Sequence, residues 1–85
     1  MNTTFLLMAE FGQTDIPLDI VAHRYLGLSD KQAYAKASRA NLPFPAFRAG
    51  SQKSPWLVRV TDLAQWLDTE RTKAASDWQK RNGYQ

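Results

Sequence analysis

The segment that most constrains the fold is residues 16–40, where two helical patterns follow each other with only a short turn between them. Pro17 suits the first turn of a helix, and an apolar stripe follows it with the spacing i, i+3, i+4 and i+7. The stripe consists of Leu18, Val21, Ala22 and Tyr25. Gly27 ends this helix, because glycine accepts the left-handed conformation at low cost. Ser29 and Gln32 have the spacing of a capping box, so the segment predicts a helix-turn-helix pair.

The second of these helices has two different faces. Its inner face carries Ala33, Ala37 and Ala40, whose small side chains allow close packing against the first helix. Its outer face and the flanks of that face carry Lys31, Gln32, Tyr34, Ala35, Ser38 and Arg39. The lysine, arginine, glutamine, serine and tyrosine side chains offer donors to base edges and phosphates, and the small Ala35 and Ser38 would let the helix backbone approach closely. A DNA major groove admits one α-helix. An ordinary solvated face would have a similar composition, and Tyr34 suits packing as well as DNA contact.

The next segment predicts a β-hairpin. Pro43 and Pro45 end the second helix, Ala46 to Arg48 fits a short strand, and residues 56–60 alternate with the period of a strand. The loop between the strands is polar and basic. Its candidate contacts to phosphate or to the minor groove are Arg48, Ser51, Gln52, Lys53 and Ser54. The simpler interpretation is a hydrophilic hairpin loop.

Charge is distributed unevenly along the chain. Residues 1–30 hold one base and four acids, and residues 60–85 hold four of each sign. Residues 31–59 hold no acid, and their bases are Lys31, Lys36, Arg39, Arg48, Lys53 and Arg59. A block of +6 creates a positive potential that attracts a polyanion. Because no amphipathic helix with bulky apolar anchors accompanies the block, nucleic acid is a better candidate than a membrane surface.

The two ends of the chain are less informative. Residues 3–11 fit a short helix with a threonine cap and Gly12 at its end, or a strand, and we favour the helix. A last helix begins near residues 61–62 and becomes polar past Arg71. We expect Tyr25, Trp56 and Trp66 in the core, whereas Trp78 could fold back on the domain or make a dimer contact. The expected organisation is one domain over residues 1–72 and a helical extension or tail over residues 73–85.

Several functional classes are disfavoured. The chain has no cysteine and one histidine, so a protein zinc site is not expected. His23 and Asp19 are four residues apart, which more often gives a surface contact than an acid–base pair. No nucleophile elbow or phosphate-binding glycine loop is present, so we expect no catalytic residue and no cofactor. Neither a signal peptide nor a membrane span is evident, and the lack of cysteine fits the cytoplasm.

A family resemblance covers about residues 3–72. The ordered motifs FLLMAEFG, IPLDIVAHRYLGLS, LPFPAFR and SQKSPWLVRVTDLAQWLD resemble the pyocin activator family of transcriptional regulators. They are also similar to the wider excisionase and MerR-type winged helix-turn-helix class. The resemblance implies recognition-helix roles for Lys31, Gln32, Ala35, Lys36 and Arg39, and hairpin roles for Arg48, Gln52, Lys53 and Ser54. Activation of bacteriocin or prophage genes is implied by the resemblance alone.

The sequence therefore predicts a mainly α fold with a small β-hairpin, arranged as a winged helix-turn-helix that binds double-stranded DNA. We expect a homodimer or an array on DNA, since one small module buries little DNA surface. For an activator, RNA polymerase is a further candidate partner. Two alternatives remain: an excisionase-like protein that bends DNA, and a phage-type module that binds another protein.

Overall fold

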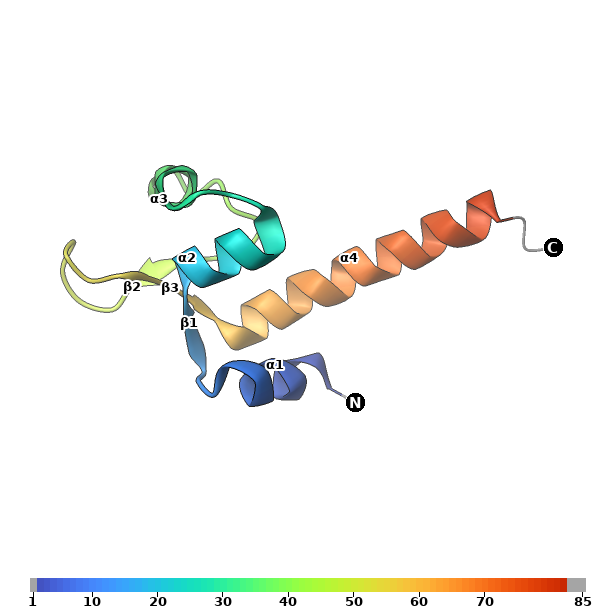
Figure 1. Cartoon of the computed structure of the whole chain (residues 1–85), viewed down its shortest axis with the longest axis horizontal. Helices are drawn as coiled ribbons and strands as arrows, with labels where there is room; N and C mark the ends of the chain where they lie inside the picture. The colour runs from blue at the N-terminus through green and yellow to red at the C-terminus, as the bar shows by residue number, and fades with distance from the viewer. Residues whose placement is uncertain (1, 83–85) are drawn as a thin grey trace.

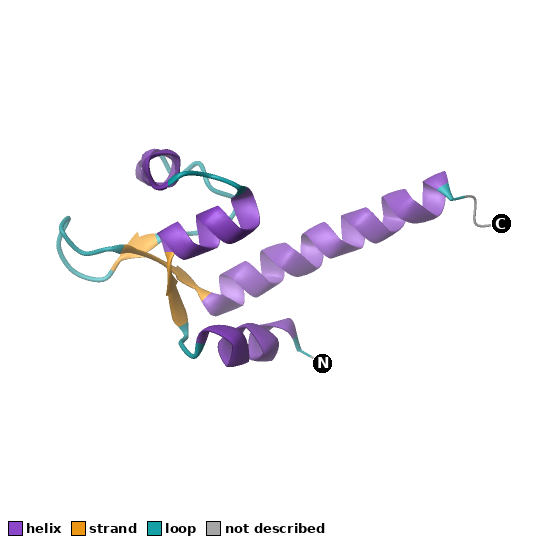
Figure 2. Ribbon diagram, in the orientation of Figure 1, coloured by secondary structure: helices purple, strands orange, loops and turns teal. Residues whose placement is uncertain are grey.

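A computed structural model describes residues 2–82 of the chain. This part is mainly helical, with four helices, the second of them ending in a π-helical turn, and a three-stranded antiparallel sheet (Figures 1 and 2). The elements are α1 (Thr3–Phe11), β1 (Asp15–Pro17), α2 (Leu18–Val21), η1 (Ala22–Leu26), α3 (Asp30–Ser38), β2 (Phe47–Arg48), β3 (Trp56–Arg59) and α4 (Val60–Arg81). The molecule is elongated, 54 × 26 × 16 Å, because most of α4 points away from the sheet (Figure 1).

The sheet has β3 in the centre, with β1 on one side and β2 on the other. The predicted hairpin is confirmed as the antiparallel pair β2 and β3, in which Arg48 lies opposite Trp56. The strand β1 was not predicted, and it pairs with β3 through Ile16 opposite Val58. Three residues are too few to show an alternating pattern, so this strand forms because β3 is there to pair with it. The placement of Pro17 in a helical turn was wrong, since Pro17 is the last residue of β1.

The predicted helix pair is present as α2–η1 followed by α3. Gly27 ends the first helix at φ 67°, in the left-handed conformation that glycine accepts easily. The capping box is complete: Ser29 Oγ accepts from the Gln32 N–H at 3.2 Å, and Gln32 Oε1 accepts from the Ser29 N–H at 3.0 Å. Ala33 and Ala37 are buried as expected. Ala40 is not, because α3 ends at Ser38 and Ala40 turns away at φ 53°.

The first and last helices run side by side. Residues 3–11 are helical, as favoured, but the cap is Asn2, whose Oδ1 accepts from the N–H groups of the next turn, and not a threonine. Thr3 Oγ1 donates to Asp68 Oδ1 at 2.6 Å, which joins the start of α1 to the middle of α4. The helix α4 begins at Val60, which the alternation had assigned to the strand, and continues without a break to Arg81.

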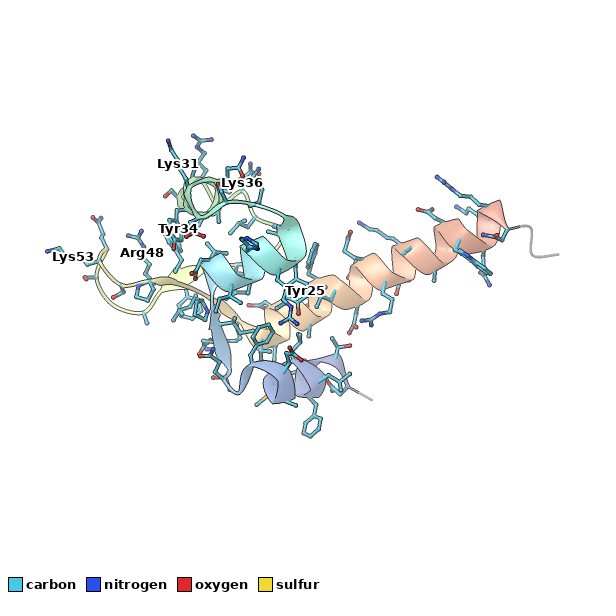
Figure 3. All side chains as sticks on the ribbon, in the orientation of Figure 1. Tyr25, Lys31, Tyr34, Lys36, Arg48 and Lys53 are labelled. Atoms are coloured by element: carbon cyan, nitrogen blue, oxygen red, sulfur yellow. The ribbon has the colours of Figure 1, made fainter. Side chains whose placement is uncertain are left out.

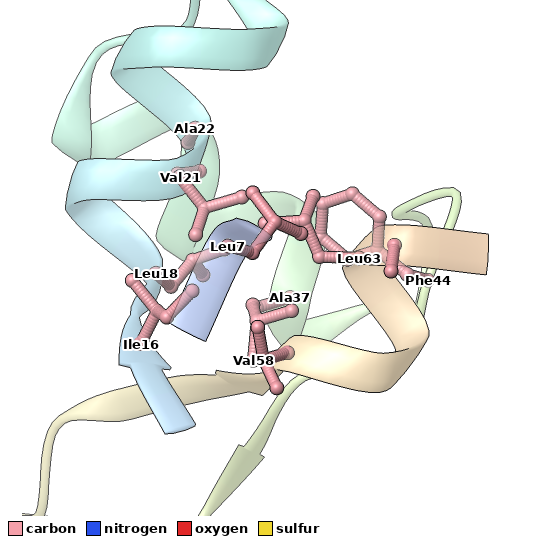
Figure 4. Close-up of a cluster of buried hydrophobic side chains, with 12 residues drawn as sticks. Leu7, Ile16, Leu18, Val21, Ala22, Ala37, Phe44, Val58 and Leu63 are labelled. Carbon is pink, nitrogen blue, oxygen red and sulfur yellow. The ribbon is translucent and has the colours of Figure 1, made fainter. Parts of the chain in front are cut away.

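The core lies where the sheet, α1, α2, α3 and the first turns of α4 meet (Figure 4). Its largest fully buried side chains are Ile16, Leu18, Val21, Val58, Val60 and Leu63. The aromatic residues expected in the core are half-buried and pack against it: Tyr25, Trp56 and Trp66. Trp66 meets the ring of buried Phe44 edge-on, with centroids 5.4 Å apart. This contact attaches the Pro43–Pro45 segment to α4.

We expect Leu63→Ala to lower the free energy of unfolding by about 2–5 kcal/mol, because it leaves a cavity at a side chain with no exposure. Leu6→Ala is the matched control, since Leu6 is 48% exposed on α1. The control should change stability by no more than about 0.5 kcal/mol. Urea unfolding followed by tryptophan fluorescence measures both, and equal effects of the two substitutions would contradict this description of the core.

Candidate nucleic-acid interface

The outer face of α3 and the tip of the β2–β3 hairpin lie at the same end of the molecule (Figure 3). Lys31, Tyr34 and Lys36 extend from α3, and Arg48 and Lys53 extend from the hairpin (Figure 3). On α3 the exposed candidates are Lys31, Gln32, Tyr34, Ala35, Ser38 and Arg39, and Lys36 is half-buried. On the hairpin the exposed candidates are Arg48, Ser51, Gln52 and Lys53, and Ser54 is half-buried. We call this end of the molecule the α3–hairpin surface.

Two polar side chains of α3 already make bonds within their own helix. The amide oxygen of Gln32 accepts from the backbone of Ser29, so it serves the helix cap. The hydroxyl of Ser38 donates to the backbone oxygen of Tyr34 at 3.1 Å. Gln32 retains its amide N–H groups as donors, and Ser38 retains acceptor capacity. Both residues are therefore more restricted in orientation than their exposure alone suggests.

Tyr34 lies between the two lysines of α3 and the hairpin and is 40% exposed. Burial raises the pKa of its hydroxyl above the ordinary value, and the carboxylates of Asp19 and Asp30 raise this pKa further. The hydroxyl is therefore protonated at neutral pH and can donate a hydrogen bond. The two carboxylates were not part of the sequence-based site, because they lie outside the acid-free block in the chain. The fold places them near Tyr34.

The hairpin loop is organised by Arg48. Its guanidinium lies over the ring of Trp56, 4.6 Å from the centroid, and donates to the backbone oxygen of Gln52. Ser51 closes the turn, since its backbone oxygen accepts from the Ser54 N–H at 3.0 Å and its hydroxyl from the Lys53 N–H at 3.2 Å. Sequence reasoning missed Trp56 as a support for the loop. The strand register would have indicated it, because Arg48 and Trp56 are direct cross-strand partners.

Arg59 is not brought together with the other candidates. The loop precedes Trp56 at the start of β3, whereas Arg59 is at the opposite end of that strand, where α4 begins. There its Nε lies 3.6 Å from Asp15 Oδ1 across the β1–β3 pair. Arg59 therefore joins two strands at the far end of the sheet from the hairpin tip.

Four of the eleven bases in residues 2–82 have an ion-pair partner, and seven, among them Lys80 and Arg81 at the end of α4, have none. Between residues 2 and 82, the paired bases are Arg24 with Glu10, Arg59 with Asp15, Arg71 with Asp68, and Lys73 with Glu70. In the same range, no ion pair involves the five bases of the α3–hairpin surface, which are Lys31, Lys36, Arg39, Arg48 and Lys53. Their charge is available to an external partner, and five such bases at one end favour a polyanion.

Among residues 2–82, no group of three or more His, Cys, Asp or Glu side chains is placed to hold a metal ion. Over the same part of the chain, no helix combines the length and apolar character that crossing a membrane requires.

A comparison with protein families gives a match to the family described as Pyocin activator protein PrtN, over residues 3–74. The match spans every element from α1 to β3 and the larger part of α4. No curated protein and no solved structure matches the chain at a significant level.

We expect Arg48→Ala to speed hydrogen exchange at the Lys53 and Ser54 amides on the order of fivefold or more, since it removes both the stacking on Trp56 and the bond to Gln52. Global stability should change by no more than about 1 kcal/mol, because Arg48 is exposed and its two contacts lie within the hairpin. Arg39→Ala is the control, since it removes an exposed arginine outside the loop. Unchanged exchange in the Arg48 variant would show that the loop is ordered by its backbone alone.

Proposed function

The chain belongs to the pyocin activator protein PrtN family, a family of transcriptional activators and not of enzymes, and we propose that it activates transcription by binding promoter DNA. One observation carries the DNA-binding part of this proposal. The five bases of the α3–hairpin surface come from two different elements, share one end of the molecule, and have no ion-pair partner within residues 2–82. Phosphate contacts from such bases would supply much of the affinity.

The proposed architecture is a winged helix-turn-helix. In it, α2–η1 and α3 form the helix pair, and the β2–β3 hairpin is the wing. We propose that α3 enters the major groove and that the wing contacts the backbone or the minor groove of the same duplex. The short turn at Gly27 and the Ser29–Gln32 capping box support this arrangement, because they fix the start of α3 directly after the first helix.

The surroundings of the candidate residues indicate which contacts each could make with DNA. We propose that Lys31, Lys36, Arg39 and Lys53 contact phosphates, while Tyr34, Gln32, Ala35 and Ser38 meet base edges. In the wing, Arg48, Ser51 and Ser54 would hold the loop so that Gln52 and Lys53 reach the duplex. The carboxylates of Asp19 and Asp30 beside Tyr34 disfavour a phosphate at that point and favour the amino group of a cytosine, which donates to carboxylates. Arg59 lies outside this proposed interface.

The wider biological role rests on the family. We propose that the regulated genes are of the bacteriocin or prophage type, that the protein acts in the cytoplasm, and that it occupies promoter DNA as a homodimer or an array. RNA polymerase would be a partner at such promoters. We also propose that residues 1–72 form the DNA-binding domain, and that the helix beyond them is an extension with a separate role.

Removing one base from each element tests the interface. In Lys31→Ala/Lys53→Ala, we expect affinity for a promoter duplex to fall roughly tenfold or more near physiological salt. The slope of log affinity against log salt concentration should decrease by about 2 in magnitude, because each lost phosphate contact removes close to one unit. Fluorescence anisotropy of a labelled duplex over a salt series measures both quantities.

The matched control is Lys73→Ala/Lys80→Ala, which removes the same number of charges from α4, away from the α3–hairpin surface. Relative to the wild type, this control should change the affinity by no more than about twofold. It should change the salt slope by no more than about 0.5. An equal loss in both double variants would mean that net charge and not the α3–hairpin surface determines binding. Absent or salt-insensitive binding by the wild type would overturn the proposal.

Transcription distinguishes an activator from an architectural protein that bends DNA. With purified RNA polymerase and a promoter fragment selected by binding, we expect the wild-type protein to raise transcript yield severalfold. The Lys31→Ala/Lys53→Ala variant should lose this effect at the same protein concentration. A bent duplex in a circular-permutation assay without any rise in transcription would favour the excisionase-like alternative.

A further inference from the structure

The loop end of the wing carries two bases, Arg48 and Lys53, in different surroundings. The Arg48 guanidinium lies 4.6 Å from the centroid of the Trp56 ring and donates to the backbone oxygen of Gln52. Lys53 extends from the outer part of the loop (Figure 3), and no ion pair within residues 2–82 involves its ammonium group. One base is therefore held by the wing itself, whereas the other is presented to the outside.

Contacts within the wing give the loop its shape. The Ser54 N–H donates to the Ser51 backbone oxygen at 3.0 Å, and the Lys53 N–H donates to the Ser51 hydroxyl at 3.2 Å. A Cβ added at Gly50 would lie 2.9 Å from Ser54 Oγ, so the two sides of the loop approach closely there. Trp56 is half-buried against the core and contacts Arg48 through its ring. Trp56 therefore joins the loop to the rest of the domain.

The width of the wing limits how it can meet a duplex. The backbones of two paired strands lie about 4.8 Å apart before side chains are added, whereas the minor groove is about 6 Å wide. Only a single side chain of the wing can therefore enter the minor groove. Arginine suits that position better than lysine, because its guanidinium is more weakly hydrated. Arg48 is already held on Trp56, and Arg59 lies at the opposite end of β3, beside Asp15.

We propose that the wing contacts the phosphate backbone and does not read the minor groove, with Lys53 as its contacting residue and with Arg48 and Trp56 as positioning residues. This inference rests on the proposed function, in which the wing meets the duplex that α3 reads. The ammonium of Lys53 is a compact, strongly hydrated charge, which suits an exposed phosphate. Arg48 holds the loop at Gln52, the residue before Lys53, and so fixes where that charge is presented. A loop ordered in advance loses less conformational freedom on binding.

Substitutions that conserve charge separate positioning from phosphate contact. We expect Arg48→Lys to lower the affinity for the promoter duplex roughly fivefold, because lysine lacks the planar group that stacks on Trp56. The salt slope should stay unchanged, because no phosphate contact is lost. Lys53→Arg should keep the affinity within about twofold, and Lys53→Ala should lower the slope by about 1. Fluorescence anisotropy over a salt series measures all three variants. An Arg48→Lys variant that binds like the wild type, or that lowers the slope, overturns the positioning role.

Two substitutions of Trp56 test the surface on which Arg48 lies. Trp56→Phe keeps an aromatic face, and it removes no hydrogen bond, because the buried indole N–H has no partner within residues 2–82. We expect Trp56→Phe to bind within about twofold of the wild type and Trp56→Leu to lose affinity as Arg48→Lys does. The double variant Arg48→Lys/Trp56→Leu should lose no more than either single variant, since both substitutions remove the same contact. Additive losses would overturn the coupling of the two residues.

Inosine in the DNA tests the groove. Inosine lacks the amino group that guanine presents in the minor groove, and it keeps the N7 and O6 acceptors of the major groove. We expect the promoter duplex with inosine in place of every guanine to bind the wild-type protein within about threefold of the natural duplex. A larger change would mean that the minor groove is read, and it would overturn the proposal.

These results distinguish the inference from the function on which it rests. A wild-type protein that binds no DNA would overturn the proposed function and this inference together. Salt-dependent binding by the wild type, combined with wild-type affinity in Arg48→Lys, would leave the proposed function in place and overturn the inference alone.

Discussion

The central strand β3 is the constraint on which the rest of the structure depends. It pairs with β1 on one side and with β2 on the other, and its Val58 is fully buried opposite Ile16. The chain leaves β1 directly into α2, and it leaves β3 directly into α4. The positions of the helix pair, the hairpin and the long helix therefore all follow from one four-residue strand. In a domain this small, with its modest core, such a shared element gives the parts fixed relative positions without a large interior.

The same strand separates two electrostatic environments. At its start, the hairpin tip carries Arg48 and Lys53 without ion-pair partners in the described residues, and α3 lies at the same end. At its finish, Arg59 is paired with Asp15. A base in an exposed pair contributes little to stability, and its charge is partly neutralised by its neighbour. Of the seven bases without an ion-pair partner in the described residues, five consequently lie at the α3–hairpin surface, and the other two, Lys80 and Arg81, lie in the last turn of α4.

Local rules were sufficient for the parts of the fold that local chemistry determines. Gly27 and the capping box at Ser29 each specify a boundary through neighbouring residues, and the alternation from Trp56 onward indicates a strand without marking its end at Arg59. The helix pair and the hairpin were predictable from these signals. The strand β1 was not predictable, because three residues form a strand only when β3 is present to pair with them. The features of the candidate site were predictable, or not, for the same reason. Exposure of the α3 bases follows from helical period, whereas the stacking of Arg48 on Trp56 and the approach of Asp19 to Tyr34 require the tertiary fold.

The length of α4 places its outer turns far from the α3–hairpin surface. A helix of 22 residues is about 33 Å long, and only its first turns are needed to complete the core. The remaining turns carry exposed side chains, Trp78 among them, well away from the α3–hairpin surface. DNA bound at the α3–hairpin surface would therefore leave the outer turns of α4 uncovered.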